Sequence, residues 1–135
     1  MHVNVVCRNL KEDRVIPRFS RHLSARLGWS LTASPDPAAD VIYLSGYFEW
    51  PLVATLLSEG PLDYRHRPKL AAYFTHREEQ PPGNAKAKLF DAVAARADLR
   101  VVTAAMYAEM VAPHGLTVQI APPVERERFT IPARK

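Results

Sequence analysis

Short runs of apolar residues recur along the chain, and most of them are rich in β-branched side chains. Runs of this kind, bounded by polar residues or by Gly and Pro, are typical of strands buried on both sides of a parallel sheet. Clear runs occupy residues 2–7, 41–44, 70–74, 99–102 and 117–120. Residues 29–32 could add a short strand. The pattern therefore predicts strands separated by longer polar and amphipathic segments.

One helix is expected between residues 13 and 27, where apolar residues recur at helical spacing: Ile16, Phe19, Leu23 and Leu27. Asp13 is placed to cap its start, and Gly28 stands where a helix commonly ends. Three basic residues share the opposite side of this helix: Arg14, Arg18 and Arg21. Such a stripe is usually a solvated face, and contact with anionic lipid headgroups or a charged acceptor is the alternative.

Further helices are expected to begin at Pro51, Asn84 and Thr103. The apolar stripe of the last one consists of Met106, Tyr107, Met110 and Val111. Strands that alternate with helices form βαβ units, and their right-handed crossovers produce a parallel sheet. The predicted fold class is therefore α/β: a Rossmann-like open, mostly parallel sheet with helices on both faces, formed by residues 1–121.

The chain has 135 residues, of which 47% are hydrophobic, so it can bury one core but has no room for a second full domain. It holds no apolar run of about 18 residues and no signal peptide pattern, and we expect a cytoplasmic protein. The net charge of +4 favours anionic partners. Because the basic residues are dispersed and do not alternate with aromatic ones, nucleic acid is not an expected partner.

Most standard signatures of catalysis are missing from the sequence. No G-x-G-x-x-G motif follows the first strand, and neither a P-loop nor a G-x-S-x-G motif is present. The lone cysteine, Cys7, can form no internal disulfide and is expected to be buried. The five histidines lack metal-ligand spacing. The sequence therefore predicts neither a cofactor nor a metal, and it disfavours a one-domain hydrolase.

Candidate chemistry lies in the loops after the predicted strands, because ligands of open α/β sheets bind at the carboxyl ends of the strands. These loops are residues 8–13, 45–49 and 75–79, together with Thr103. The densest polar cluster, Thr75-His76-Arg77-Glu78, combines a hydroxyl, an imidazole, a guanidinium and a carboxylate. It is either a functional cluster or a strand end at which Arg77 pairs with Glu78 or Glu79.

Three segments of the chain resemble a known family. Residues 39–45 (ADVIYLS) are similar to a strand that leads to an acceptor cleft, and residues 74–78 (FTHRE) are similar to a strand-end segment with a histidine. Residues 98–129 are similar to the strand, helix and crossing segment at which such enzymes pass between domains. In their order they resemble the N-terminal domain of GT-B-fold glycosyltransferases, especially the retaining glycosyltransferase family 4. The resemblance implies that residues 122–135 are an interdomain crossing.

The resemblance also implies roles for individual residues in the transfer of a sugar from a nucleotide-sugar donor. His76 would contact the transferred sugar, with Arg77 and Glu78 orienting it. The acceptor side would include Ser45, Tyr47, Glu49, Thr75 and Thr103. The donor's phosphates would approach Arg8, Asn9 and Lys11, in a loop that lacks the family's glycine. Charge from Arg8 and Lys11 would therefore replace close approach of the backbone.

In this family a C-terminal domain holds the nucleotide sugar, and we expect the chain to be inactive without such a domain. A sugar, a lipid or another small molecule could serve as the acceptor. The alternative function is a non-enzymatic binding or regulatory module that docks a protein partner or a membrane.

Overall fold

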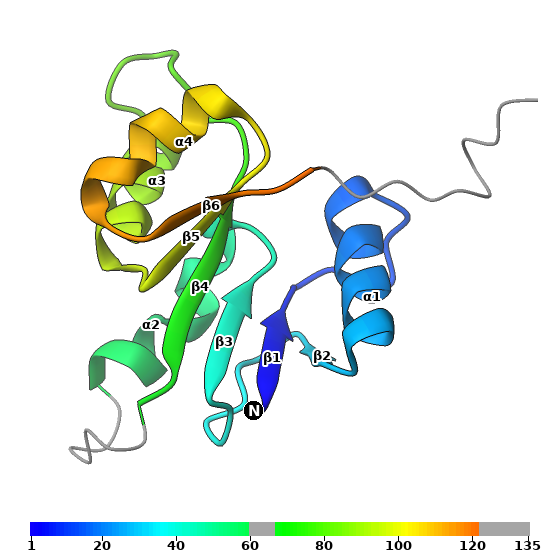
Figure 1. Cartoon of the computed structure of the whole chain (residues 1–135). Helices are drawn as coiled ribbons and strands as arrows, with labels where there is room; N and C mark the ends of the chain where they lie inside the picture. Colours follow the sequence, from blue (N-terminus) through cyan, green and yellow to red (C-terminus); the bar gives the residue numbers. More distant parts are fainter. Residues whose placement is uncertain (60–66, 122–135) are drawn as a thin grey trace, which may run out of the picture.

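The computed structural model describes residues 1–59 and 67–121. In this part of the chain, six strands form one parallel sheet in the order β2-β1-β3-β4-β5-β6 (Figure 1). The strands are β1 (Val3–Val6), β2 (Ser30–Thr32), β3 (Val41–Leu44), β4 (Lys69–Phe74), β5 (Leu99–Val102) and β6 (Thr117–Gln119). Each apolar run of the sequence has become one of these strands, and the predicted open parallel sheet is confirmed. The expected crossing segment, residues 122–135, lies outside the described residues.

Helices cover both faces of the sheet, as predicted (Figure 1). Within the described residues, the α-helices are α1 (Val15–Leu27), α2 (Trp50–Glu59), α3 (Ala85–Arg96) and α4 (Ala105–Val111). Two short 3-10 helices accompany them: η1 (Tyr47–Glu49) leads into α2, and η3 (Ala112–His114) follows α4. None of the helices in residues 1–59 and 67–121 is long and apolar enough to cross a membrane.

The two faces of the sheet carry separate cores because successive side chains of a strand point in opposite directions. One core joins Val6, Leu44 and Phe74 of the strands to residues of α2, α3 and α4, including Phe90. The other core contains Val5, Tyr43 and Tyr73, against which α1 packs with Ile16 and Leu23. Within the described residues, three helices cover the first core and one covers the second.

The ends of the helices follow the sequence only in part. Gly28 ends α1 in the left-handed conformation with φ 68°, and Asn84 caps α3 by accepting a hydrogen bond of 2.8 Å from the backbone N–H of Ala87, both as predicted. The expected cap at Asp13 is wrong. Arg14 occupies the cap position without a side-chain hydrogen bond, and the carboxylate of Asp13 lies 3.4 Å from Nε of Arg18 instead.

The predicted apolar stripe of α4 is also half wrong. Tyr107 and Val111 face the core, but the side chains of Met106 and Met110 are 60% and 37% exposed. The helix has seven residues and lies beside β6, the last strand of the sheet. Since no further strand lies beyond β6 in the described part of the chain, only a narrow stripe of α4 meets apolar surface.

The strand order places a crevice between β1 and β3. The chain runs from β1 to β2 on one side and then to β3 on the other side, so the order of the strands reverses at β1. Connections that leave β1 and β3 therefore diverge at their carboxyl ends, which is where ligands of open α/β sheets bind. The loops after β1 and β3 are two of those predicted to carry chemistry.

Candidate functional site

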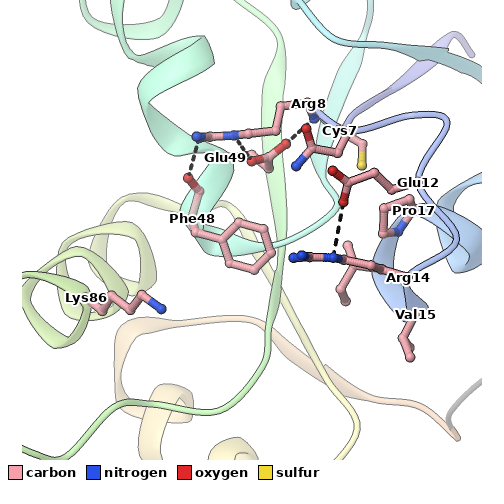
Figure 2. A pocket seen from close by; sticks show the side chains of 11 residues that line it. Cys7, Arg8, Glu12, Arg14, Val15, Pro17, Phe48, Glu49 and Lys86 are labelled. Carbon is pink, nitrogen blue, oxygen red and sulfur yellow. Dashed lines mark hydrogen bonds and ion pairs between the residues drawn. The ribbon is translucent and has the colours of Figure 1, made fainter.

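A cavity of about 520 Å³ opens at this reversal point (Figure 2). Its walls come from the loop after β1, the first turn of α1, η1 and the first turn of α3. Three residues predicted from the sequence line it: Arg8, Asn9 and Glu49. The buried thiol of Cys7 also lies in its wall, so the expected burial of Cys7 is confirmed. Lys11 is exposed and lies outside the lining.

Glu49 joins the loops after β1 and β3. Its side chain is 1% exposed, and Oε1 accepts a hydrogen bond of 2.6 Å from Nε of Arg8 while Oε2 accepts one from the backbone N–H of Arg8. The same guanidinium donates to the carbonyl oxygen of Phe48 at 3.1 Å. Arg8 is therefore engaged by the protein (Figure 2), and its charge is balanced by a buried carboxylate.

The open part of the cavity is bounded by Arg14, which the sequence indicated as part of the basic stripe of the first helix, and by Lys86 and Phe48, which the sequence did not indicate. Arg14 and Lys86 point toward each other from opposite sides, and in this view the ring of Phe48 lies between them (Figure 2). Gly46 allows this position of Phe48, because a Cβ at residue 46 would overlap the ring. Beside Arg14, the first turn of α1 carries no acidic residue and no side-chain cap. Backbone N–H groups at such a helix start favour anions.

The basic stripe of α1 is not a free surface. Arg21 donates from Nη1 to the carbonyl oxygens of Leu10 and Glu12, the latter at 3.0 Å, and thus ties the loop after β1 to the helix. Arg18 lies against Asp13, as described above. Arg14 is the most exposed of the three, and its Nε lies 3.3 Å from Oε2 of Glu12. The stripe therefore helps to shape the loop that forms one wall of the cavity.

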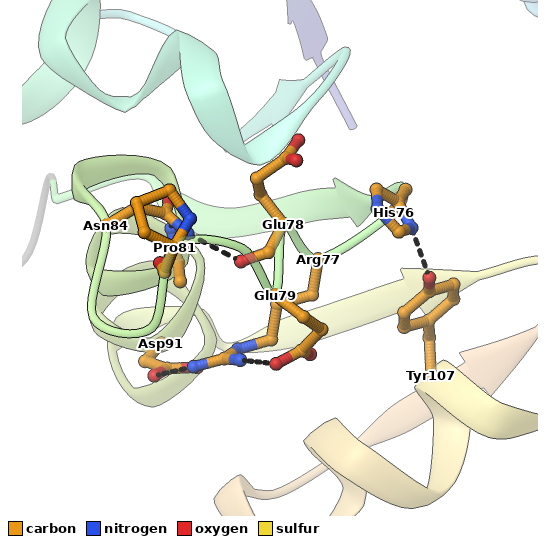
Figure 3. A network of polar contacts seen from close by, with 9 residues as sticks. His76, Arg77, Glu78, Glu79, Pro81, Asn84, Asp91 and Tyr107 are labelled. Carbon is orange, nitrogen blue, oxygen red and sulfur yellow. Dashed lines mark hydrogen bonds and ion pairs between the residues drawn. The ribbon is translucent and has the colours of Figure 1, made fainter.

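The cluster after β4 lies on the other side of η1. His76 is exposed, and its Nδ1 lies 2.7 Å from the hydroxyl of Tyr107 on α4 (Figure 3). This contact leaves Nε2 of the imidazole without a hydrogen bond to the described residues. Tyr107 was expected only as an apolar residue of a helix stripe. Its hydroxyl instead holds the imidazole at the edge of the sheet.

Arg77 is locked in ion pairs. It donates from Nε and Nη2 to both carboxylate oxygens of Asp91 on α3, at 3.0 and 2.8 Å, and from Nη1 to Glu79 at 2.7 Å (Figure 3). The bonds from Arg77 hold the pKa of the Asp91 carboxyl below its ordinary value. Of the two pairings considered from the sequence, Glu79 is the one that the structure contains, and the pair with Asp91 is additional.

Glu78 points away from these ion pairs, whereas its backbone carbonyl accepts a bond of 2.8 Å from the side chain of Asn84 (Figure 3). Burial raises the pKa of the Tyr47 hydroxyl, and the nearby negative charge of the Glu78 carboxylate raises it further. Tyr47 is itself buried, stacked on Phe74 and in edge contact with Phe90. Tyr47 therefore belongs mainly to the core below the cluster.

The three remaining predicted residues differ in their surroundings. Ser45 is buried, and its hydroxyl has no hydrogen-bond partner among the described residues. Thr103 lies after β5, with Oγ1 at 3.1 Å from the hydroxyl of Tyr73. Thr75 is half-buried at the end of β4. All three lie at carboxyl ends of strands, but none lines the cavity between β1 and β3.

The structure thus divides the predicted residues between two neighbouring places: the cavity, with Arg8, Asn9 and Glu49, and the cluster with His76 and Glu78. Phe48 and Tyr47 of η1 stand between them, with ring centroids 5.5 Å apart. In residues 1–59 and 67–121, no group of three or more His, Cys, Asp and Glu side chains is arranged to hold a metal ion. No protein-family model matches this chain, and neither does any curated protein or solved structure.

Proposed function

We propose that this chain is the acceptor-side domain of a cytoplasmic glycosyltransferase, whose donor nucleotide sugar is held by a second domain. The observation that supports it is the position of the cavity at the reversal point of a Rossmann-like sheet, next to a strand-end cluster with an exposed histidine. Binding sites of unrelated function share this position, so the family likeness of residues 39–45 and 74–78 supplies the reaction class.

In this proposal the acceptor occupies the cavity, and the transferred sugar lies over the cluster. His76 contacts the sugar through Nε2, since Nδ1 is engaged by Tyr107. The carboxylate of Glu78 orients a sugar hydroxyl. Lys86 and Arg14 line the cavity and supply fixed positive charge that positions the bound acceptor for the reaction.

Arg77 takes a different part from the one expected for it. Its guanidinium is engaged by Asp91 and Glu79, so it fixes the loop after β4 on α3. We propose that Arg77 positions His76 and Glu78 and does not itself contact the sugar. Glu49 likewise holds Arg8 and shapes the cavity wall from beneath.

The test is titration of the isotopically labelled chain with nucleotide sugars and with candidate acceptors, followed by two-dimensional NMR. Acceptors are expected to shift the amide signals around the cavity and of residues 75–79, and His76→Ala is expected to remove the shifts near the cluster. His114→Ala, at an exposed histidine of η3, is the matched control and should leave them unchanged. Sugar transfer by the chain alone would contradict the proposal, as would a full panel without shifts at these residues.

A second candidate function, a protein-docking module, is favoured by one observation. Four large apolar side chains on α4 and on the segment through β6 are exposed: Met106, Met110, Leu116 and Val118. Apolar side chains gathered on a surface often mark an interaction site. A partner that covers them should slow hydrogen exchange in α4 and leave the cavity open to ligands. Acceptor-induced shifts at the cavity would favour the transferase instead.

A further inference from the structure

The charged side chains that line the cavity carry a net positive charge. Its lining includes the cations of Arg8, Arg14 and Lys86 and the carboxylates of Glu12 and Glu49. Glu49 is occupied by Arg8, and Glu12 lies 3.3 Å from Arg14 in a pair that is largely exposed to solvent. An exposed pair of this kind contributes little to stability and can be exchanged for another anion.

Lys86 is the cation with the most freedom to bind. It projects from the first turn of α3 toward the cavity (Figure 2), and it has no hydrogen bond or ion pair with the described residues. Arg14 faces it from the start of α1, where no acidic side chain occupies the helix terminus. Two cations and a helix start therefore border the same cavity, which suits a phosphate group.

Apart from Asn9, the rest of the lining is apolar. Val15, Ile16 and Pro17 form one side, and the ring of Phe48 forms another. Val15 is 74% exposed, although it is a large apolar residue beside a cavity. A ligand that covered it would remove apolar surface from water, which is favourable in proportion to the area buried. The cavity is therefore suited to a ligand with a charged head and an apolar body.

We propose that this cavity binds an organic phosphate whose ester group is an apolar chain or ring. The phosphate lies between Lys86 and Arg14 at the start of α1, and the apolar group lies against Phe48 and Val15. The inference rests on the proposed function only where it makes this compound the acceptor. A lipid phosphate and a soluble phosphate ester share the required chemistry.

Calorimetry on the complete chain tests the two ends of the cavity separately, with octyl phosphate, inorganic phosphate and octanol as probes. Octyl phosphate is expected to bind at least about tenfold more tightly than inorganic phosphate, which corresponds to the burial of about two methylene groups. Octanol should bind weakly or not at all. Equal affinity for octyl and inorganic phosphate would overturn the proposal, and so would equal affinity for octyl phosphate and octanol.

Variants then locate the ligand. Lys86→Gln is expected to weaken octyl phosphate binding about tenfold through loss of a charge-assisted hydrogen bond. Lys88→Gln is the matched control on the same helix, because Lys88 is exposed and does not line the cavity. Val15→Asn should weaken octyl phosphate but not inorganic phosphate. Equal effects of the two lysine variants would place the phosphate elsewhere and overturn the proposal.

Two further comparisons identify the source of the ligand and separate the two proposals. Vesicles of phosphatidylcholine with phosphatidic acid should displace octyl phosphate if the natural ligand is a lipid, and should fail to do so if it is a soluble ester. Both outcomes support the inference. If sugar acceptors shift His76 while octyl phosphate does not bind, this inference fails and the proposed function stands. If octyl phosphate binds but neither acceptors nor donors do, the proposed function fails alone.

Discussion

The carboxylate of Glu49 is almost completely withdrawn from water, and both of its oxygens accept hydrogen bonds from Arg8. Taking a carboxylate out of water is unfavourable unless donors replace the water, and Arg8 supplies them from its backbone and from its side chain. Removal of the carboxylate leaves the backbone N–H of Arg8 unpaired in a half-buried place. One side chain thus holds together the two loops that diverge at the reversal point.

We therefore expect Glu49→Ala to lower the free energy of unfolding by about 2–3 kcal/mol, the usual effect of breaking a buried charged hydrogen bond. Urea unfolding followed by circular dichroism measures the change. Glu12→Ala is the control in the same cavity wall, and it should change the free energy by less than about 0.5 kcal/mol because its pair with Arg14 is exposed. Similar decreases in the free energy of unfolding for the two variants would contradict the role of Glu49 in joining the loops after β1 and β3.

Arg100 is a second buried charge, and its partners are backbone oxygens. It is 2% exposed within β5, and its guanidinium donates to the carbonyls of Ala94, Ala97 and Leu116. The first two carbonyls belong to the end of α3, where the helix leaves acceptors without partners. The third belongs to the segment that enters β6. Arg100 therefore closes a helix and fixes the next strand at the same time.

Arg100→Met keeps much of the side-chain volume but leaves these buried carbonyls without donors. The expected loss is about 3 kcal/mol, since each unsatisfied buried polar group costs roughly 1–3 kcal/mol and solvent recovers part of it. Thermal and urea unfolding provide the measurement. Arg96→Met, in the last turn of α3 and half-buried, is the matched control and should cost less. An unaffected Arg100→Met protein would contradict the role of these three bonds.

At the level of elements, the strands were predictable because their apolar runs are continuous and are bounded by polar residues, Gly or Pro. Residues 41–44 and 99–102 coincide with β3 and β5. The second of these strands contains Arg100, which no local rule would bury. Its partners come from α3 and from the segment before β6, so the reason for its burial lies in tertiary structure.

Elements also explain which part of the candidate site the sequence indicated. Arg8, Glu49 and His76 lie in the segments that follow β1, β3 and β4, so the topology brings them to one edge of the sheet. Lys86 and Arg14 reach the cavity from the first turns of helices. Their position depends on how α1 and α3 pack on opposite faces, and residue spacing carries no signal for that.

The pair between Arg77 and Asp91 joins the loop after β4 to α3, and it makes stability depend on pH. The folded-state pKa of Asp91 is lowered from the ordinary value of 3.8. A carboxyl with a lowered folded-state pKa adds stability above its unfolded-state pKa, and that stability is lost as the pH falls through the folded-state pKa. The pair with Arg77 therefore adds stability at neutral pH, and this contribution is lost only under acid conditions.

Asp91→Asn should accordingly lower the unfolding midpoint at pH 7, and the difference from the original chain should shrink as the pH falls below 3.8. Because the side chain of Asp91 is more than half exposed, solvent screens the pair and the difference at pH 7 should be small. Thermal unfolding between neutral and acid pH checks it. Glu109→Gln on α4 is the control, and an equal acid dependence there would argue against the pair as its source.

For the whole molecule, the unequal covering of the two faces is the feature with the widest consequences. The buried residues of α1 are Pro17, Ser20 and Ser24, whereas those of α3 include Phe90 and Val93. A buried Phe or Val side chain contributes about 1.5–3 kcal/mol. The helix whose first turn forms one side of the cavity, α1, is therefore held more weakly than α3.

We expect native-state hydrogen exchange to show this difference. Amides of α1 should exchange through openings that require about 1–2 kcal/mol less free energy than those of α3, because the buried side chains of α1 itself are small whereas those of α3 include Phe90 and Val93. Phe19→Ala removes the edge contact with Tyr73, in which the ring centroids are 6.1 Å apart. This variant should increase the difference in opening free energy between α1 and α3. Equal protection of α1 and α3 would contradict this account of the two faces.

A ligand that contacts helices on both faces of the sheet should stabilise the more weakly held helix, α1, more than α3. Octyl phosphate in the cavity would contact Arg14 and Val15 of α1 as well as Lys86 of α3, so α1 could not detach without releasing it. Binding to the closed form alone stabilises that form by mass action. Saturating octyl phosphate should thus slow exchange in α1 more than in α3, and Lys86→Gln should abolish the effect. If octyl phosphate slowed exchange in α3 alone, the ligand would not reach the start of α1. It would then not link the helices on the two faces of the sheet.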